Sequence, residues 1–308
     1  MKKLFGIILL FITNSVAAQS LQHVTIILDW FLNPDHAPLF VAEQQGYFKQ
    51  QGLDVSIVTP ANPNDGPKLV AAGKADITIE YPISLLQQVA EGLPLVRVGA
   101  LFPENLNAVA VLKSSSIKTL QDLKGKTVAM SAGDADKAIL SAMLKQVGVN
   151  PNDVSFINVN YNLVQALLSH RVDAVTGIMR NVEPIEMAIA GQPARLFYPE
   201  DYGVPPSDSA IWVVSRNEVS KTWVNKFLKA IEEGTLYLQK HPEAMWKAFS
   251  KTHPELNTEF NYRSWMVTYP LFSKNPGGYN ARQYENYAKF LKAQGLIKTV
   301  PPLKLYVA

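Results

Sequence analysis

The sequence contains no cysteine and only five histidines among its 308 residues. Without cysteine the chain cannot form a disulfide framework, a thiolate metal site or a cysteine nucleophile. The histidines are dispersed, and no two have the spacing of metal ligands on one helix. The motifs G-x-S-x-G and H-E-x-x-H and the Walker loop are also missing, so no common catalytic signature is present. We therefore expect neither a metal nor a cofactor.

Long runs of charge or of apolar residues are also scarce. The formal charge is +3, and it falls to +1 when the two positive charges of Lys2 and Lys3 are removed. Because there is no basic run, nucleic acid is not expected as a partner. The apolar run Leu4–Ile12 is shorter than the about 20 residues that a membrane span needs.

The same N-terminal stretch has the pattern of a signal peptide. Two lysines precede the apolar run, and the small residues Val16, Ala17 and Ala18 follow it. We expect residues 1–18 to be removed near Ala18 and the mature chain to be exported. Together with the absence of cysteine, this pattern favours a bacterial periplasm over a disulfide-stapled secreted domain.

Apolar, β-branched runs alternate with helical patterns in two series along the chain, which is typical of parallel sheets flanked by helices. The expected strands are His23–Leu28, Leu53–Thr59, Asp76–Ile79 and Leu95–Leu101, then Thr127–Met130, Val154–Val159 and Ala174–Ile178. A mature chain of about 290 residues exceeds one typical core. The fold class is therefore α/β, with two lobes, each a mostly parallel sheet with flanking helices.

The expected division of the chain follows from these series. Residues 19–108 form the first part of lobe 1, residues 109–212 form lobe 2, and residues 213–308 are helices that mostly return to lobe 1. The strands Asn107–Leu112 and Ala210–Ser215 break the alternation and are expected to mark the crossings between lobes.

A short internal sequence similarity supports two similar lobes. The segments Leu69–Thr78 and Leu167–Val175 both end a helix, place a basic residue two positions before an aspartate, and continue into an apolar strand. The aspartates are Asp76 and Asp173. They occupy matching places in the two series.

The candidate site is centred on the loop after the first strand. Within a few residues this loop carries Trp30, Asn33, Asp35 and His36. In open α/β sheets, ligands bind at the carboxyl ends of strands. Taken singly, Trp30 could equally be core, Asp35 a helix cap and His36 a satisfied histidine, but together they favour a site. We expect Trp30 to stack on a ligand ring, and Asn33 and His36 to supply polar contacts, although Asn33 equally suits a turn.

Two further residues follow strands in the same way. Tyr81 comes after the third strand and is expected to cover another side of the ligand. Glu183 follows Ala174–Ile178 and is expected to bind the ligand from lobe 2. On position alone, Glu183 could equally be a carboxylate at a helix N-terminus, favoured by the helix dipole.

The loop Ser131–Asp136 bears on ligand charge. A loop before a helix often holds an anion, but here Asp134 and Asp136 add negative charge. They disfavour phosphate, sulfonate or nitrate at this loop, even if they only cap the helix. A neutral or weakly cationic heterocycle suits it better, and riboflavin stays open as an alternative.

The opening loop also carries a family resemblance. The motif D-W-x-x-N-x-x-H-x-x-L-x-x-A-x-x-x-G-Y-F, over Asp29–Phe48, resembles that of periplasmic proteins that bind the pyrimidine precursor of thiamine, hydroxymethylpyrimidine or formylaminopyrimidine. The segment N-V-E-P-I-E, which contains Glu183, is similar as well. The resemblance implies the two-lobed type II periplasmic binding fold, with the ligand in the cleft between the lobes. It also implies an aminopyrimidine ligand, a monomer, and an ABC transporter permease as partner. It also implies that Glu183 matches the acidic ligand-binding position of the family.

The same motif resembles the fungal enzymes that make the phosphorylated pyrimidine. In that comparison His36 matches the histidine that these enzymes use as a reactant. The enzymes carry a cysteine-rich iron-binding segment, whereas this chain has no cysteine. We therefore expect a binding protein, not an enzyme. The alternatives are a binding protein for riboflavin, another small heterocycle or a sulfonate, and a synthase-like enzyme.

Overall fold

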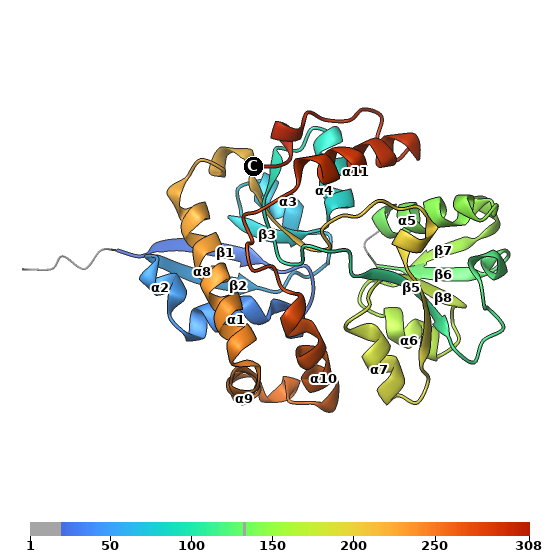
Figure 1. The fold of residues 1–308 in the computed structure, drawn as a ribbon, viewed down its shortest axis with the longest axis horizontal. Coiled ribbons are helices and arrows are strands. Elements are labelled where there is room, and N and C mark those ends of the chain that lie inside the picture. The colour runs from blue at the N-terminus through green and yellow to red at the C-terminus, as the bar shows by residue number, and fades with distance from the viewer. Residues whose placement is uncertain (1–19, 132–133) are drawn as a thin grey trace, which may run out of the picture.

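The computed structural model describes residues 20–131 and 134–308. The predicted signal peptide, residues 1–18, and residues 132–133 of the acidic loop lie outside the described residues. Figure 1 shows two lobes side by side, joined by extended crossings, with the C-terminal helices on the first lobe and beside the junction. In the described part of the chain, no helix combines the length and the hydropathy needed to cross a membrane.

The first lobe is built on a five-stranded sheet in the order β2-β1-β3-β10-β4. Its strands are β1 (Gln22–Ile27), β2 (Leu53–Val58), β3 (Ile77–Glu80), β4 (Leu95–Ala100) and β10 (Ile211–Ser215). β1 pairs in parallel with β2 and β3, and β10 runs antiparallel between β3 and β4.

The second lobe repeats this arrangement in the order β7-β6-β8-β5-β9. Its strands are β5 (Asn107–Leu112), β6 (Thr127–Met130), β7 (Ser155–Asn158), β8 (Ala174–Met179) and β9 (Ala194–Phe197). β5 is the antiparallel member here and occupies the place that β10 has in the first lobe. The two mostly parallel sheets confirm the predicted fold class. β9 is absent from the predicted strands.

The internal sequence similarity between the segments of Asp76 and Asp173 has a physical basis. The carboxylate of Asp76 accepts the backbone N–H of Thr25 at 2.7 Å, and that of Asp173 accepts the N–H of Thr127 at 2.9 Å. Each aspartate also donates its own N–H to the carbonyl of the same threonine. One aspartate therefore fastens the start of β3 to β1 in the first lobe, and the other fastens the start of β8 to β6 in the second.

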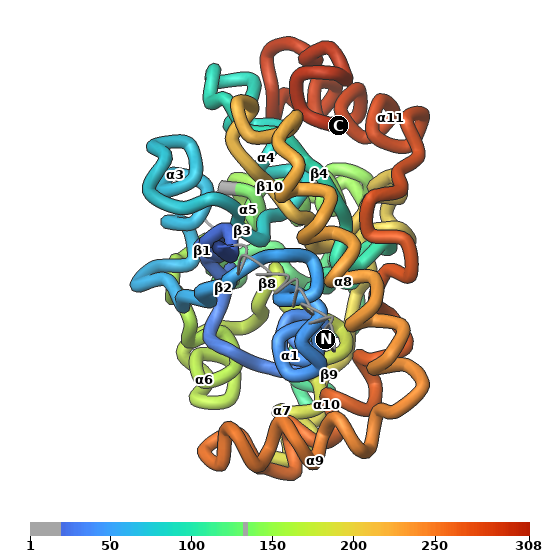
Figure 2. The backbone as a smooth tube through the Cα atoms, turned by 90° about the vertical axis from the view of Figure 1, so that its left-hand side faces the viewer, coloured from blue at the N-terminus to red at the C-terminus, as the bar shows by residue number. Residues whose placement is uncertain are grey.

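Helices cover the faces of both sheets (Figures 1 and 2). The first lobe has α1 (Ala37–Gln44), α2 (Tyr47–Gln50), α3 (Gly66–Ala71) and α4 (Pro82–Ala90), and the second has α5 (Asp134–Gln146), α6 (Leu163–Leu168) and α7 (Glu183–Ile189). The C-terminal helices are α8 (Thr222–Lys240), α9 (Pro242–Thr252), α10 (Glu259–Thr268) and α11 (Ala281–Ala293).

Helix α8 packs against α1 (Figure 2). The approach is close at Gly234, where an added Cβ would come within 2.9 Å of the carbonyl oxygen of Pro38. A glycine is therefore needed there. Helix α8 begins at Thr222, a few residues after the 3-10 turn Arg216–Glu218.

A bulge interrupts strand β8 beside the cleft. The pairing with β5 joins Ala108 to Ile178 and Val109 to Thr176, so Gly177 is left out of the ladder. Gly177 has a φ of 80°, in the left-handed region. An added Cβ would overlap the carboxyl group of Asp136. Backbone conformation and packing therefore both require glycine at this position.

We predict that Gly177→Ala lowers the free energy of unfolding in urea by at least about 2 kcal/mol more than Gly148→Ala does. Gly148 is a matched control because its φ is 76° and nothing lies within 4 Å of its added Cβ. Both variants acquire the same backbone strain, but only Gly177→Ala also displaces Asp136. Equal losses in the two variants would contradict the packing argument.

Candidate ligand-binding site

A cavity of about 440 Å³ lies between the two lobes. This volume is within the range of small-molecule sites, about 300–1,000 Å³. Its lining includes residues that follow the carboxyl ends of strands in both sheets, as expected for ligand sites in open α/β folds. All five predicted site residues, Trp30, Asn33, His36, Tyr81 and Glu183, line it. The fold thus brings together side chains from three strand ends.

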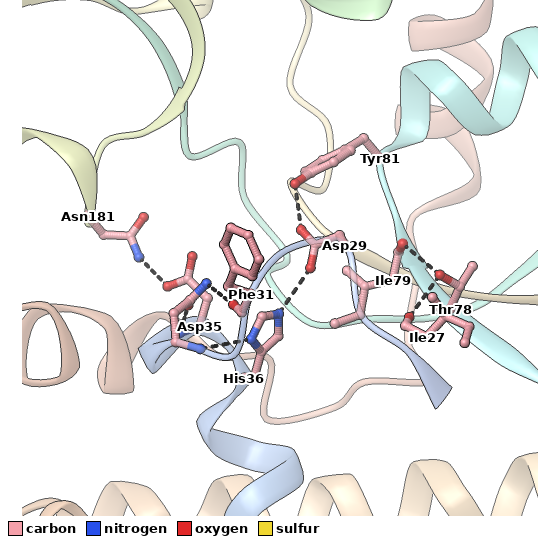
Figure 3. A network of polar contacts seen from close by, with 10 residues as sticks. Ile27, Asp29, Phe31, Asp35, His36, Thr78, Ile79, Tyr81 and Asn181 are labelled. Atoms are coloured by element: carbon pink, nitrogen blue, oxygen red, sulfur yellow. Dashed lines mark hydrogen bonds and ion pairs between the residues drawn. The ribbon is translucent and has the colours of Figure 1, made fainter. Parts of the chain in front are cut away.

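Asp29 is the centre of the first-lobe side of the cavity. One carboxylate oxygen lies 3.0 Å from Nε2 of His36, and the other accepts the hydroxyl of Tyr81 at 2.6 Å (Figure 3). Burial alone would raise the pKa of Asp29, but the hydrogen bonds from His36 and Tyr81 outweigh it and bring this pKa below its ordinary value. Asp29 therefore stays ionised and holds the loops after β1 and β3 together.

His36 and Asn33 have local partners. His36 is 1% exposed, and its Nδ1 accepts the backbone N–H of Asn33 at 3.2 Å. Since Nδ1 accepts, Nε2 carries the hydrogen that points to Asp29. The Asn33 side chain accepts the N–H of Asp35 at 2.7 Å and donates to the carbonyl of Phe31 at 2.9 Å. In this conformation both side chains shape the loop that presents Trp30, and their direct contact with a ligand stays a prediction.

An aromatic cluster closes another side of the cavity. Tyr161, from the second lobe, lies with its ring centroid 4.5 Å from that of Trp30 and 4.2 Å from that of Phe31. Its hydroxyl donates to the carbonyl of Pro60 in the first lobe at 3.1 Å. Sequence reasoning missed Tyr161, although it follows the expected strand Val154–Val159 at a strand end, the signal by which Trp30 was selected.

Glu183 approaches the cavity from the second lobe as the first residue of α7. Its carboxyl group accepts the backbone N–H of Met179 at 2.8 Å. Burial raises the pKa of Glu183 to about 8, more than its backbone hydrogen bonds lower it. At neutral pH this carboxyl group is therefore largely protonated, so it can donate a hydrogen bond as well as accept one.

The cavity is rich in carboxyl groups and poor in basic side chains among the described lining residues. Six acids line it: Asp29, Asp35, Glu80, Asp136, Glu183 and Glu186. None of the lining residues in the described part of the chain is lysine or arginine. Burial also raises the pKa of Asp35 and of Glu80 to about 7. The lining favours a neutral or cationic ligand over an anion. The described residues hold no group of three or more histidines or acids placed to bind a metal ion.

The sequence matches a family model described as NMT1/THI5 like over residues 33–245. The chain belongs to this family. A Haemophilus influenzae protein whose name assigns it to thiamine biosynthesis is 44% identical, over 92% of this chain and 91% of its own length. The range that matches the NMT1/THI5-like family begins at Asn33, after β1, and includes the other strands of the first sheet, all of the second sheet and α8.

Other relatives of this NMT1/THI5-like chain have two kinds of name. A formylaminopyrimidine-binding protein of Halalkalibacterium halodurans is 30% identical over 78% of this chain and 73% of its own length. A 4-amino-5-hydroxymethyl-2-methylpyrimidine phosphate synthase of Saccharomyces cerevisiae is 32% identical over 83% and 78%. The fold is that of the alkanesulfonate-binding protein SsuA of Xanthomonas axonopodis, with a TM-score of 0.74 and 18% identity over 93% of this chain and 98% of that one.

The buried carboxyl groups predict that the protein becomes more stable as pH falls. The pKa values of Asp35, Glu80 and Glu183 are about 7, 7 and 8 in the folded protein, against about 4 in an unfolded chain. Between these values the folded state binds more protons, so the free energy of unfolding falls as pH rises. Calorimetry should give a melting temperature several degrees higher at about pH 5.5 than at about pH 8.5.

Glu183→Gln is the control for this profile. It removes one of the three carboxyl groups whose pKa is about 7 or 8, so it should flatten the decline between about pH 6 and pH 8.5. Carboxyl groups with a lowered pKa, such as Asp29, change the stability only at pH values below this range. A melting temperature that rises steadily with pH would contradict the prediction.

Proposed function

We propose that this protein is the periplasmic substrate-binding protein of an ABC importer and captures a thiamine-related aminopyrimidine for uptake. The observation that carries the proposal is the position of the Glu183 carboxyl group, which lines the cavity from the second lobe while Trp30 lines it from the first. The formylaminopyrimidine-binding relative supports the ligand class. The partners would be the ligand and a transporter permease, with the protein acting as a monomer.

The chemistry of Glu183 suits an aminopyrimidine. Such a ring presents an amino N–H donor beside a ring nitrogen acceptor. A carboxyl group can satisfy both, accepting from the amino group and sharing its proton with the ring nitrogen. Because burial favours the protonated form of Glu183, this sharing does not require a charged carboxylate in the cavity.

The aromatic side chains suit a flat ring. Trp30 offers a large face at the end of β1, and stacking on such a face adds about 0.5–1.5 kcal/mol beyond the area buried. Tyr81, fixed by Asp29 through its hydroxyl, and Tyr161 line the same cavity. In our proposal, Asn33 and His36 supply polar contacts to the ligand and also hold the Trp30 loop in place.

A binding role is favoured over the synthase activity named for the fungal relatives. A phosphorylated pyrimidine needs cations around its phosphate, and no lysine or arginine is present among the described lining residues. His36, which resembles the reacting histidine of those enzymes, is 1% exposed and hydrogen-bonded through both ring nitrogens. The chain also has no cysteine. We therefore propose reversible capture without catalysis.

Calorimetric titration of a small panel tests this proposal. Hydroxymethylpyrimidine, or its aminomethyl or formylaminomethyl relative, should bind with a micromolar or tighter dissociation constant, roughly −8 kcal/mol or better. The phosphate ester of hydroxymethylpyrimidine and an alkanesulfonate should bind at least about 100-fold more weakly, because no cation in the described lining offsets their charge. If riboflavin alone bound tightly, the proposed ligand class would be wrong. If the protein turned over the pyrimidine, the proposed binding role would be wrong.

Glu183→Gln should weaken the aminopyrimidine by about 100-fold or more, because an amide can donate an N–H to the ring nitrogen but cannot transfer a proton to it, so the charge-assisted pair is lost. It keeps an oxygen that can accept the N–H of Met179, so the fold is preserved. Glu186→Gln is the comparison, since Glu186 is one turn further along α7 and already accepts from Gln165 at 3.1 Å. The loss of aminopyrimidine affinity in Glu186→Gln should be several-fold smaller than in Glu183→Gln. Wild-type affinity in Glu183→Gln would exclude both the role of Glu183 and the ligand class.

A further inference from the structure

A buried hydrogen-bond cluster joins the two lobes beside the cavity. The side-chain amide of Asn181 donates to Oδ1 of Asp35 at 2.8 Å and to Oγ1 of Thr268 at 2.8 Å. The Thr268 hydroxyl lies 3.4 Å from the same Asp35 oxygen. All three side chains are buried. Figure 3 shows Asn181 reaching Asp35 from the second lobe.

The three residues come from segments far apart in the sequence. Asp35 belongs to the 3-10 turn Pro34–His36 that ends the Trp30 loop, and Asn181 lies between β8 and α7. Thr268 is the last residue of α10, a helix that contacts both that turn and α7. The cluster therefore forms where three segments of the chain meet across the cleft.

The cluster lies next to the two sides of the proposed binding site. Asn181 is two residues before Glu183, and Asp35 is one residue before His36, which holds Asp29. Neither Asn181 nor Thr268 lines the cavity itself. The amide of Asn181 thus connects the segment that carries Glu183 to the loop that carries Trp30 without occupying ligand space.

We propose that Asn181 is a positioning residue, which through Asp35 and Thr268 holds the lobes together and sets the separation of Glu183 and Trp30. The inference rests on the proposed function, because it assigns Glu183 and Trp30 to the ligand. Ligand capture in two-lobed binding proteins involves hinge closure of the lobes. The hydrogen bonds of Asn181 to the first lobe form only when the lobes approach, so they stabilise the closed state relative to the open one.

The hydrogen-bond pattern is specific for an amide. Both N–H groups of Asn181 are used, one on a carboxyl oxygen and one on a hydroxyl oxygen. Its Oδ1 is buried without a hydrogen-bond partner among the described residues, so the amide is oriented for donation toward the first lobe. An apolar residue of similar size would fill the same space without making these bonds.

The test measures the separation of the lobes directly. Because the chain has no cysteine, the double variant Lys49→Cys and Lys145→Cys accepts exactly two spin labels, on exposed positions of α2 and α5, one in each lobe. Double electron–electron resonance then gives the distribution of distances between the lobes. In this background, Asn181→Leu and the nearly isosteric Thr268→Val should each lengthen and broaden the distribution in the absence of ligand.

The same variants should release hydroxymethylpyrimidine faster, by about tenfold for Asn181→Leu, with a smaller change in the association rate. Asn150→Leu is the matched control. Asn150 is also in the second lobe, but its side chain accepts the N–H of Asn152 and so caps the local turn Pro151–Asp153. It should lower the melting temperature without changing the distance distribution.

Unchanged distances and dissociation rates in both Asn181→Leu and Thr268→Val would overturn the inference and leave the proposed function standing. Longer distances in these variants, in a protein whose wild type binds no pyrimidine, would support the positioning role and overturn the ligand class. A lower melting temperature with unchanged distances would reduce Asn181 to an ordinary packing residue and would also overturn the inference.

Discussion

Each sheet contains one antiparallel strand that the chain enters from the other lobe, β5 in the second sheet and β10 in the first. The rest of the structure depends on the constraint that these two crossings impose. The chain leaves the carboxyl end of β4 and enters β5 at Asn107, opposite Met179 at the carboxyl end of β8. The six residues between these strands can span at most about 20 Å. The return strand β10 begins at Ile211, opposite Glu80 at the end of β3. Both crossings therefore join carboxyl edges, and those edges must face each other.

Because these edges face each other, loops that would be solvated on a single sheet become the walls of a cavity, and their carboxyl groups lose water. The groups respond according to their partners. Asp29 interacts favourably with His36, accepts the Tyr81 hydroxyl and keeps its charge. Glu80 and Glu183 accept hydrogen bonds from uncharged donors only and lie near other acids, so burial raises their pKa values. One charged carboxylate thus organises the first-lobe loops, while protonated ones can contact a ligand without an isolated charge.

Sequence reasoning identified the parts of this site that obey local rules. Trp30, Tyr81 and Glu183 were found because each follows an apolar strand, and the two sheets were found because apolar runs alternate with helices. What was missed depends on long-range pairing. Strand β9 is short and only partly buried, so it lacks a strong apolar signal. The partners of Asn181 are 146 and 87 residues away, and no local pattern encodes such contacts.

The fold alone does not decide what the cleft holds. The sulfonate-binding relative shares the architecture at 18% identity, and family members at 32% and 30% carry the names of a synthase and of a binding protein. Function must therefore be argued from side chains at strand ends. In this chain those ends supply acids and aromatic rings and, among the described lining residues, no lysine or arginine. An anion would have to lose its hydration there without gaining a cation, whereas a flat base can exchange water for a ring face and a proton-sharing carboxyl group.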